Sequence, residues 1–450
     1  MTKFNKILLL VSLALHICAD AMAQADSTAA GGTSFTLLQA QEYAIKNSFA
    51  VKSVKYDADV AGYDTEGLKG IGLPQVNGTV QYLNNIYAPY NIIPAGSFGP
   101  EEVRVRFQQP HNVTIGVTAS QLLFDGTWLV GLEAARSYEL LQKKKIQKAE
   151  IDVKNDIADA YYLAVVSKEN AAVLQKFRDA LSITYAETQA YYEAGLVEKQ
   201  DVDQLSLDIN NIDIQIAYAQ EQQRFTRDLL KYQMGYPLEN EINLTDDATV
   251  LMSLDSQSLL SAPFAASQNI DVMLAQSGLR MQQLNLKAKK AAYLPNLGAA
   301  WTIQTQAQRG EFNFFDTSKP YLYGNFLAIQ MNVPILSGGQ RKYATKKVEV
   351  EIQRMKDMEV FASQSAELEY RNARMELSNA VMVYESALKS LQLAQEIYDT
   401  SEVKFREGIG SSMDLTQRSQ QVVAAEGNRI QAMLKLLQAK NRLAKALNQY

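Results

Sequence analysis

The segment LPQVNG at Leu73–Gly78 returns later in the chain as LPNLGA at Leu294–Ala299. A longer stretch, YEAGLVEKQDVDQ at Tyr192–Gln204, returns as FREGIGSSMDLTQ at Phe405–Gln417. The same two motifs therefore occur in the same order in each half of the chain. Self-similarity on this scale indicates that one structural unit has been duplicated. We therefore expect an internally duplicated fold.

The spacing of glycines predicts a matched helical span in each half. Gly126 lies 69 positions before Gly195, and Gly338 lies 70 positions before Gly408, with no proline in either span. At 1.5 Å per residue, an uninterrupted helix of this length is roughly 100 Å long. Such a helix needs packing partners along its length. We expect each one to turn back at its glycine (Gly195 or Gly408) and to be followed by an antiparallel partner.

The N-terminus has the features of a secretion signal. Residues 1–23 contain two lysines, a short apolar run and the small-residue sequence Ala-Met-Ala before the expected cleavage site. A lipoprotein is the alternative at Cys18, although Ile17 is bulkier than the residue expected before a lipidated cysteine. Cys18 is the only cysteine, so cleavage leaves neither a disulfide nor a thiol nucleophile. Residues 24–33 are predicted to be a flexible lead-in, and a helix is expected from about 34 to 70.

Four segments of about ten residues alternate between apolar and small or polar side chains, as VTIGVTAS does at Val113–Ser120. We place two strands in each repeat: about 75–85 and 112–123 in repeat 1 (residues 34–240), and about 296–307 and 322–334 in repeat 2 (residues 250–450). Their length and alternation suit membrane β-strands whose other face meets water. An ordinary half-buried sheet alternates in the same way, but the long flanking helices favour the membrane strand.

Four strands cannot close on themselves, and lipid cannot satisfy the backbone groups of an open edge. Closure must therefore come from several copies of the chain. Two copies give eight strands, whose interior side chains fill, whereas three give twelve and begin to leave a lumen. We predict a mixed α and β fold: a homotrimer in which a long α-helical barrel is continuous with a 12-stranded transmembrane β-barrel, four strands per protomer.

The chain resembles the TolC-like outer-membrane efflux protein family over about Ser34–Leu447. The resemblance depends on the order helix, two strands, long helix, glycine turn and helix, which occurs twice, and on the G-x5-D spacing in both turns. It implies an outer-membrane exit duct of a tripartite efflux pump or type I secretion system, extending into the periplasm of a Gram-negative cell. The implied partners are a periplasmic adaptor (membrane fusion protein), an inner-membrane transporter and outer-membrane lipid. The net charge of −5 gives no indication of nucleic-acid binding.

The resemblance also implies site residues at the two glycine turns. The positions implied for adaptor contact are Gly195, Leu196, Val197, Gly408, Ile409 and Gly410. The positions implied for the pore constriction are Asp201, Asp414, Gln204 and Gln417. A ring of carboxylates at a narrow aperture favours cations. Helix N-capping just past each turn is the simpler role for the two aspartates, and it is compatible with a place in the pore.

The sequence departs from the family's pattern at the second glycine turn. The family's latch tyrosine and arginine correspond to Phe405 and Gly410, and its second aspartate corresponds to Gln417. The latch is therefore expected to be absent or rebuilt, with Arg406 as the neighbouring candidate.

No catalytic, cofactor or metal motif is found, so we expect no enzymatic activity, no cofactor and no metal site. The alternative function is a periplasmic coiled-coil adaptor or scaffold, which explains the helices but not the four alternating strands. A secreted hydrolase is a more distant alternative. The cargo stays open between drugs, metal ions and polypeptides.

Overall fold

The computed structural model describes residues 33–96, 99–252 and 256–448. The expected signal peptide, Cys18 and all of the expected lead-in except Thr33 lie outside these residues. The described chain divides into two compact units. We call them the sheet unit (residues 48–155, 256–386 and 438–448) and the hairpin unit (residues 33–47, 156–252 and 387–437).

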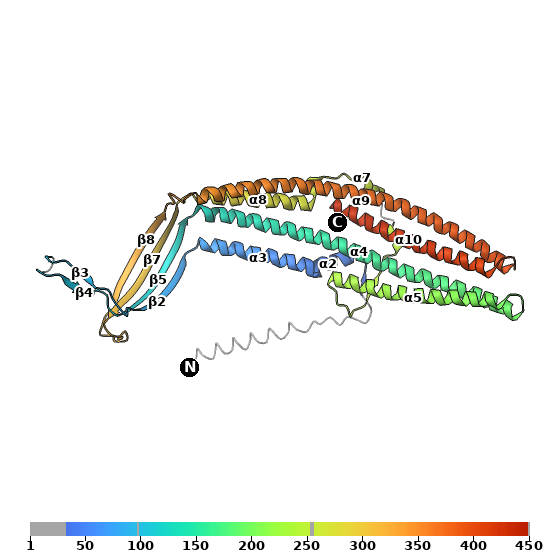
Figure 1. The fold of residues 1–450 in the computed structure, drawn as a ribbon, viewed down its shortest axis with the longest axis horizontal. Coiled ribbons are helices and arrows are strands. Elements are labelled where there is room, and N and C mark those ends of the chain that lie inside the picture. Colours follow the sequence, from blue (N-terminus) through green and yellow to red (C-terminus); the bar gives the residue numbers. More distant parts are fainter. Residues whose placement is uncertain (1–32, 97–98, 253–255, 449–450) are drawn as a thin grey trace, which may run out of the picture. The chain divides into compact units, whose positions relative to one another are not determined.

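The sheet unit contains a four-stranded antiparallel sheet in the order β2-β5-β7-β8 (Figure 1). The strands are β2 (Gln75–Asn84), β5 (His111–Phe124), β7 (Asn296–Arg309) and β8 (Leu322–Asn332). They occupy the four segments whose side chains alternate in the sequence. The two halves of the chain meet at the β5–β7 pair, where the hydroxyls of Thr118 and Thr302 are 3.0 Å apart.

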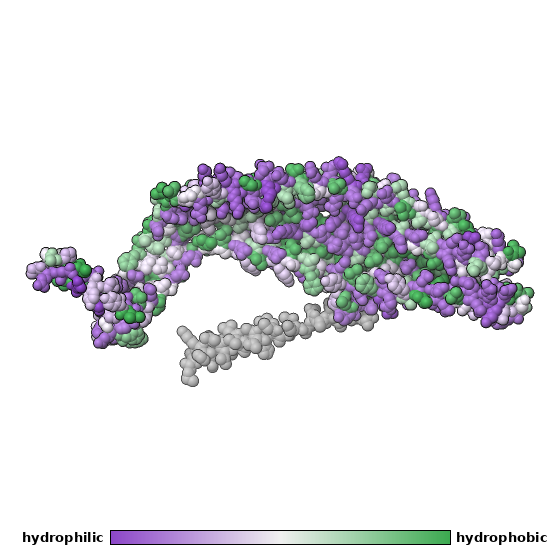
Figure 2. Space-filling view, viewed as in Figure 1, coloured by the Kyte–Doolittle hydropathy of each residue, from purple (hydrophilic) through white to green (hydrophobic). Residues whose placement is uncertain are grey.

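The register gives this sheet one apolar face and one uncharged polar face. Val76, Ala119, Trp301 and Leu327 are register partners across the four strands and lie on the apolar face. Figure 2 shows the surface over the strands as mostly pale green to white. On the apolar face the Trp301 indole donates a hydrogen bond of 2.6 Å to Asn325 Oδ1, so both polar groups are satisfied without water.

A register partner row on the other face contains Asn77, Thr118, Thr302 and Phe326. The only Lys, Arg, His, Asp or Glu residues in the four strands are His111 and Arg309, which pair at one end of the sheet. This face is therefore lined by hydroxyls, amides and, on β8, apolar side chains such as Phe326, rather than by charges.

The segment between β2 and β5 contains a short antiparallel hairpin. Its strands are β3 (Asn91–Ile93) and β4 (Val103–Val105) (Figure 1). The Arg106 guanidinium lies 4.2 Å from the centroid of the Tyr90 ring, a cation–π contact beside the hairpin. Apolar β-branched residues on both short strands supply the strand propensity that the surrounding prolines mask.

The helices of the sheet unit follow or precede its strands. They are α3 (Phe49–Ile71), the beginning of α4 (Gly126–Glu193), α7 (Ser256–Ser261), the 3-10 helix η2 (Ala266–Gln268), α8 (Ile270–Ala291), the beginning of α9 (Gln340–Arg406) and the end of α10 (Ser412–Ala446). No helix among the described residues is both long and apolar enough to cross a membrane.

The hairpin unit contains the rest of α4, α9 and α10. Its other elements are β1 (Thr33–Phe35), α2 (Leu37–Asn47), α5 (Lys199–Met234), β6 (Ile242–Leu244) and α6 (Ala248–Met252). Strands β1 and β6 pair in parallel. In Figure 1, α5 runs back along α4 and α10 runs back along α9.

The single helix expected from about 34 to 70 is wrong. Residues 33–35 form β1, because they pair with β6 and because the Tyr161 hydroxyl donates a hydrogen bond of 2.9 Å to the Phe35 carbonyl. The helical segment then breaks at Ser48, whose Oγ accepts from the Val51 amide at 3.4 Å as the N-cap of α3. The boundary between the two units falls at this break.

Candidate functional site at the hairpin turns

The two hairpins of the hairpin unit share an apolar core that holds their turns. One cluster joins α4 to α5, with Leu181 and Leu205 almost completely buried. A second cluster joins α9 to α10 through Tyr398 and Leu415, and Phe177 of α4 packs against both clusters. Burial, aided by the negative charges of Glu402 and Asp399, raises the pKa of Tyr398 to about 12. The packed core therefore fixes one hairpin relative to the other.

Both turns use a glycine in the left-handed region. Gly195 has φ 76° and Gly408 has φ 74°, a conformation that side chains with a Cβ rarely adopt. The Leu196 amide donates to the Tyr191 carbonyl at 2.8 Å, and the Ile409 amide donates to the Lys404 carbonyl at 3.0 Å. These hydrogen bonds close the last turns of α4 and α9 as Schellman-type caps.

Each turn exposes one large apolar side chain. Leu196 is 71% exposed and Ile409 is 78% exposed. The next position differs, because Val197 in the first turn corresponds to Gly410 in the second. A Cβ on Gly410 would lie 3.0 Å from the Phe405 amide nitrogen, so the second turn is the tighter one. The six positions expected to contact an adaptor therefore form two small, solvent-facing turns.

Asp201 joins the two hairpins. Its Oδ2 accepts a hydrogen bond of 3.1 Å from the Glu198 amide at the start of α5. Its Oδ1 accepts a hydrogen bond from the Ser412 hydroxyl at the start of α10. Ser412 is 6% exposed and Asp201 is partly buried, so this contact is partly shielded from water. Asp201 is therefore not the N-cap residue, which is Glu198; it closes the capping box from the N3 position and also bridges to the other hairpin.

Asp414 has a different role from Asp201. The N-terminal cap of α10 is Ser411, whose Oγ accepts from the Asp414 amide at 3.2 Å. The Asp414 carboxylate instead accepts from Arg418 at 3.1 Å, one turn along the same helix. Capping by the Asp414 side chain is therefore wrong: the second hairpin assigns that role to a serine.

The remaining two constriction candidates lie in the second turns of α5 and α10. Gln204 is partly buried, and Gln417 is exposed. Arg406, the candidate for a rebuilt latch, forms an ion pair of 3.2 Å with Glu187 of α4 and another of 3.1 Å with Glu402 of its own helix. The two hairpins are thus joined near their turns by Arg406–Glu187 as well as by Ser412–Asp201.

Two of these residues, Ser412 and Glu187, were not singled out from the sequence. Ser412 takes the place that Lys199 holds in the first motif, so the divergence between the two copies was the available signal. Glu187 lies on a helix face rich in charges and carries no comparable signal. Among the residues that the structure describes, no group of three or more His, Cys, Asp or Glu side chains could hold a metal ion.

Comparison with known proteins finds a family similar to the second part of the chain. Residues 264–449 match the outer membrane efflux protein family. The matched segment lies within the second of the two repeats. The resemblance predicted from the duplicated motifs is confirmed. Comparison with curated proteins finds no match.

Solved structures show that the outer membrane efflux fold extends over almost the whole chain. CusC, described in terms of folding and transmembrane channel formation, aligns with a TM-score of 0.71 and 16% identity over 91% of each chain. The open state of the Neisseria gonorrhoeae MtrE outer membrane channel aligns with a TM-score of 0.69 and 17% identity over 91% of this chain and 88% of its own. The Campylobacter jejuni CmeC outer membrane channel aligns with a TM-score of 0.68 and 16% identity over 92% of this chain and 85% of its own.

Proposed function

We propose that this protein is the outer-membrane exit duct of a tripartite efflux pump or type I secretion system, a passive channel that extends into the periplasm. The observation that carries the proposal is the four-stranded sheet. Its outer strands β2 and β8 each pair with one neighbour among the described strands, so both edges are open. Their apolar side chains are also exposed, with Val80 at 77% and Leu327 at 73%. Open edges with an apolar face are stable in lipid only if other copies complete the barrel.

Three copies would join edge to edge into a 12-stranded barrel. Eight strands leave no lumen, whereas twelve begin to do so. The face lined by Thr118 and Thr302 would then look inward, and the face carrying Trp301 would meet lipid. An uncharged amide and hydroxyl lining suits a duct that passes varied cargo rather than one that selects it.

The lengths of the helices support an origin by duplication. The long helices α4 and α9 have 68 and 67 residues, and their partners α5 and α10 have 36 and 35. In a trimer, three copies of both hairpins would supply the twelve helices of a periplasmic barrel. Matched lengths would bring all six turns to one level, which a continuous tube requires.

The turns are the proposed meeting point with a periplasmic adaptor, which would connect the duct to an inner-membrane transporter. The two exposed apolar side chains, Leu196 and Ile409, supply anchors beside glycines that leave the backbone accessible. Asp201, Gln204, Asp414 and Gln417 are proposed to line the constriction just behind the turns. A coiled-coil adaptor or scaffold would need neither open sheet edges nor an exposed apolar sheet face, so the duct is the better account.

Cysteine cross-linking tests the barrel. The chain has a single natural cysteine, Cys18, so pairs introduced at Thr79 on β2 and at Ala328 on β8, with neighbouring positions scanned for register, report only new contacts. We expect oxidation of the membrane-embedded protein to produce covalent trimers. The control pair Thr118→Cys and Thr302→Cys lies within one chain and should join no copies. Monomers that stay uncross-linked at every register would refute the edge-to-edge barrel.

Single-channel recordings test the constriction. Asp414→Ala and Asp201→Ala should each lower the preference for cations in planar bilayers, because each removes three carboxylates from the ring of a trimer. Glu407→Ala, an exposed carboxylate beside the turn but outside the proposed ring, is the control. Equal ion selectivity in all of these proteins and the wild type would place the constriction elsewhere.

A further inference from the structure

Asp208 on α5 is a buried carboxylate, and the fold leaves one of its oxygens without a partner. It is 6% exposed, and its Oδ2 accepts no hydrogen bond from any residue that the structure describes. A buried carboxylate oxygen without a partner is costly, and native proteins rarely retain one without a reason. Asp208 is not among the positions assigned to the turns or to the constriction.

The surrounding sequence supplies no cation for this carboxylate. Between Lys199 and Arg224, α5 contains no basic residue. Three arginines of the hairpin unit on α4 and α10 are already engaged with other carboxylates. The pairs are Arg178 with Asp213, Arg418 with Asp414, and Arg429 with Glu169 and Glu426. None of these arginines forms an ion pair with Asp208.

Asp208 lines a cavity of about 470 Å³ between α5 and α10. Its polar wall is formed by Asn211, Ser419 and Gln420, whose oxygens can accept hydrogen bonds from a bound donor. The apolar part of the wall contains Ile212 and Val423. The volume falls within the range typical of small-molecule sites.

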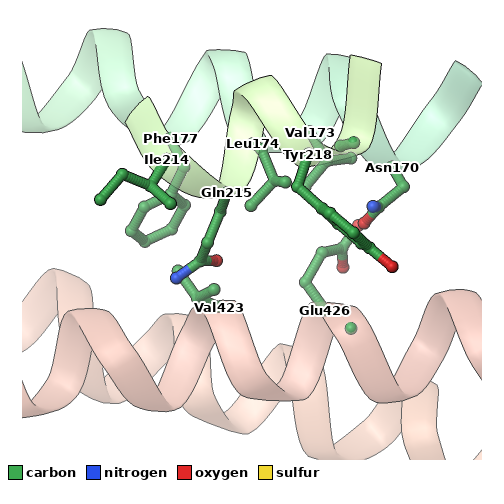
Figure 3. Close-up of a pocket in the computed structure, with 11 residues that line it drawn as sticks. Asn170, Val173, Leu174, Phe177, Ile214, Gln215, Tyr218, Val423 and Glu426 are labelled. Atoms are coloured by element: carbon green, nitrogen blue, oxygen red, sulfur yellow. The ribbon is translucent and has the colours of Figure 1, made fainter. Parts of the chain in front are cut away.

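A second cavity, of about 440 Å³, adjoins the first. The two share Ile214, Gln215 and Val423 in their walls. Figure 3 shows these three side chains, with Phe177 of α4 and Tyr218 of α5 around the same space. A ligand with its charge at Asp208 could therefore extend its apolar part along Val423 toward these two rings.

We propose that this paired cavity binds an amphipathic organic cation: a primary ammonium group at Asp208, with an apolar or aromatic body toward Phe177 and Tyr218. One carboxylate balances one positive charge. Divalent cations such as Ca²⁺ take six to eight oxygen ligands and usually several carboxylates, which this site lacks. The ammonium donates three hydrogen bonds, and Asp208, Ser419 and an amide oxygen of Asn211 or Gln420 are the available acceptors.

A matched pair of probes tests the proposal on the full chain in detergent. Phenylbutylamine carries the ammonium, whereas phenylbutanol has the same apolar body without the charge. By saturation-transfer NMR titration, wild type should bind the amine about tenfold or more tightly than the alcohol, since hydrogen bonds to charged groups are among the stronger ones. Asp208→Asn keeps the shape and removes the charge, so this preference should disappear.

Asp213→Asn is the control variant, because Asp213 lies on the same helix but is exposed and paired with Arg178. It should keep the wild-type preference for the amine. Val423→Phe, which fills the shared wall, should weaken both probes equally. Folding is not at risk in Asp208→Asn, which removes a buried charge.

Any of the following results would overturn the proposal. The first is equal affinity of wild type for the amine and the alcohol. The second is an unchanged preference in Asp208→Asn. The third is displacement of the amine by stoichiometric CaCl₂, or a basic residue of a second copy found paired with Asp208. The inference draws on the proposed function only in treating the ligand as cargo. Amine binding without channel conductance would contradict the proposed duct but support this binding site. Channel conductance without amine binding would support the duct and contradict the site.

Discussion

The two hairpin turns have nearly the same backbone but hold their aspartates in different ways. Gly195 and Gly408 differ by two degrees in φ, at 76° and 74°. Asp201 bonds across to the second hairpin through Ser412, whereas Asp414 pairs with Arg418 of its own helix. Corresponding positions of the repeated motif therefore have different structural roles.

The difference arises from two positions just before each aspartate. The first motif reads Glu198-Lys199, and the second reads Ser411-Ser412. The short serines allow one hydroxyl to cap α10 and the next to reach the other hairpin. A lysine at the second position has no acceptor oxygen to serve as a cap. Two turns with the same backbone geometry can therefore differ in the side-chain contacts around them.

The largest expected difference between the turns concerns the second residue after each glycine. Gly410→Val should destabilise the second turn by about 2–3 kcal/mol, because its Cβ would lie 3.0 Å from the Phe405 amide nitrogen. The reciprocal change, Val197→Gly, should cost less than about 1 kcal/mol. Hydrogen exchange of the turn amides measures both values. Equal protection losses in the two variants would mean that the turns are equally tight.

Gly195→Ala and Gly408→Ala are the matched controls for that experiment. Both glycines adopt positive φ, and open space surrounds the position of each Cβ. Each substitution should therefore cost about 1–2 kcal/mol through backbone strain alone. A large inequality between these two variants would show that local packing, not φ, sets the cost.

The packing between the hairpins should make the unit sensitive to alkaline pH. The pKa of Tyr398 is raised by burial from 10.0 to about 12. Below pH 10 the phenol is neutral in both folded and unfolded chains, so it has no effect. Between pH 10 and 12 the unfolded chain ionises first, and stability falls by about 2 kcal/mol.

Tyr398→Phe should remove this part of the alkaline loss. Parallel titrations of tyrosinate absorbance and of helical circular dichroism in wild type and variant measure it. Other buried tyrosines contribute equally to both proteins, so the difference isolates Tyr398. Identical alkaline unfolding curves would place Tyr398 in a more solvated position than its contact with Phe177 indicates.

Much of this architecture could be predicted from the sequence because it depends on period and length. Strict alternation marked β2, β5, β7 and β8, and proline-free spans marked α4 and α9. The hairpin formed by β3 and β4 was missed, since three-residue strands are too short to establish a period. The start of the chain was mispredicted because β1 is specified by its pairing with β6, more than 200 residues away.

For the candidate site, the sequence predicted the positions of the residues but not their contacts. The motif placed both aspartates one turn past a glycine, and the structure keeps them there. The partners of each carboxylate depend on side chains from different helices, such as Ser412 for Asp201, which no local pattern contains. Asp208 was not recognised either, because the lack of a partner for its Oδ2 is a property of the packed helices.

The two aspartates should respond unequally to substitution. Asp201→Ala removes the bridge to Ser412 and the bond to the Glu198 amide, and leaves a buried serine hydroxyl unpaired, so it should cost about 1.5 kcal/mol. Asp414→Ala loses only an ion pair between neighbouring helix turns, worth about 0.3–0.5 kcal/mol. Hydrogen-exchange protection of the backbone amides at the start of α10 measures both losses of stability. Ser412→Ala, with Asp201 intact, should reproduce most of the larger effect, and a result closer to Asp414→Ala would assign the bridge no energetic role.

The smallest expected effect concerns the second link between the hairpins. Arg406 and Glu187 are 46% and 41% exposed in their side chains, so water and salt screen their attraction. Arg406→Gln should therefore cost only about 0.5 kcal/mol at low salt and less at high salt. The Asp201–Ser412 bridge is partly buried and its serine is neutral, so its contribution should change less with salt. Exchange protection of α10 measured at both ionic strengths separates the two links. If the two contributions fell together as salt rose, the Asp201–Ser412 contact would have to be as open to solvent as the Arg406–Glu187 pair, and the contrast drawn from their burial would be wrong.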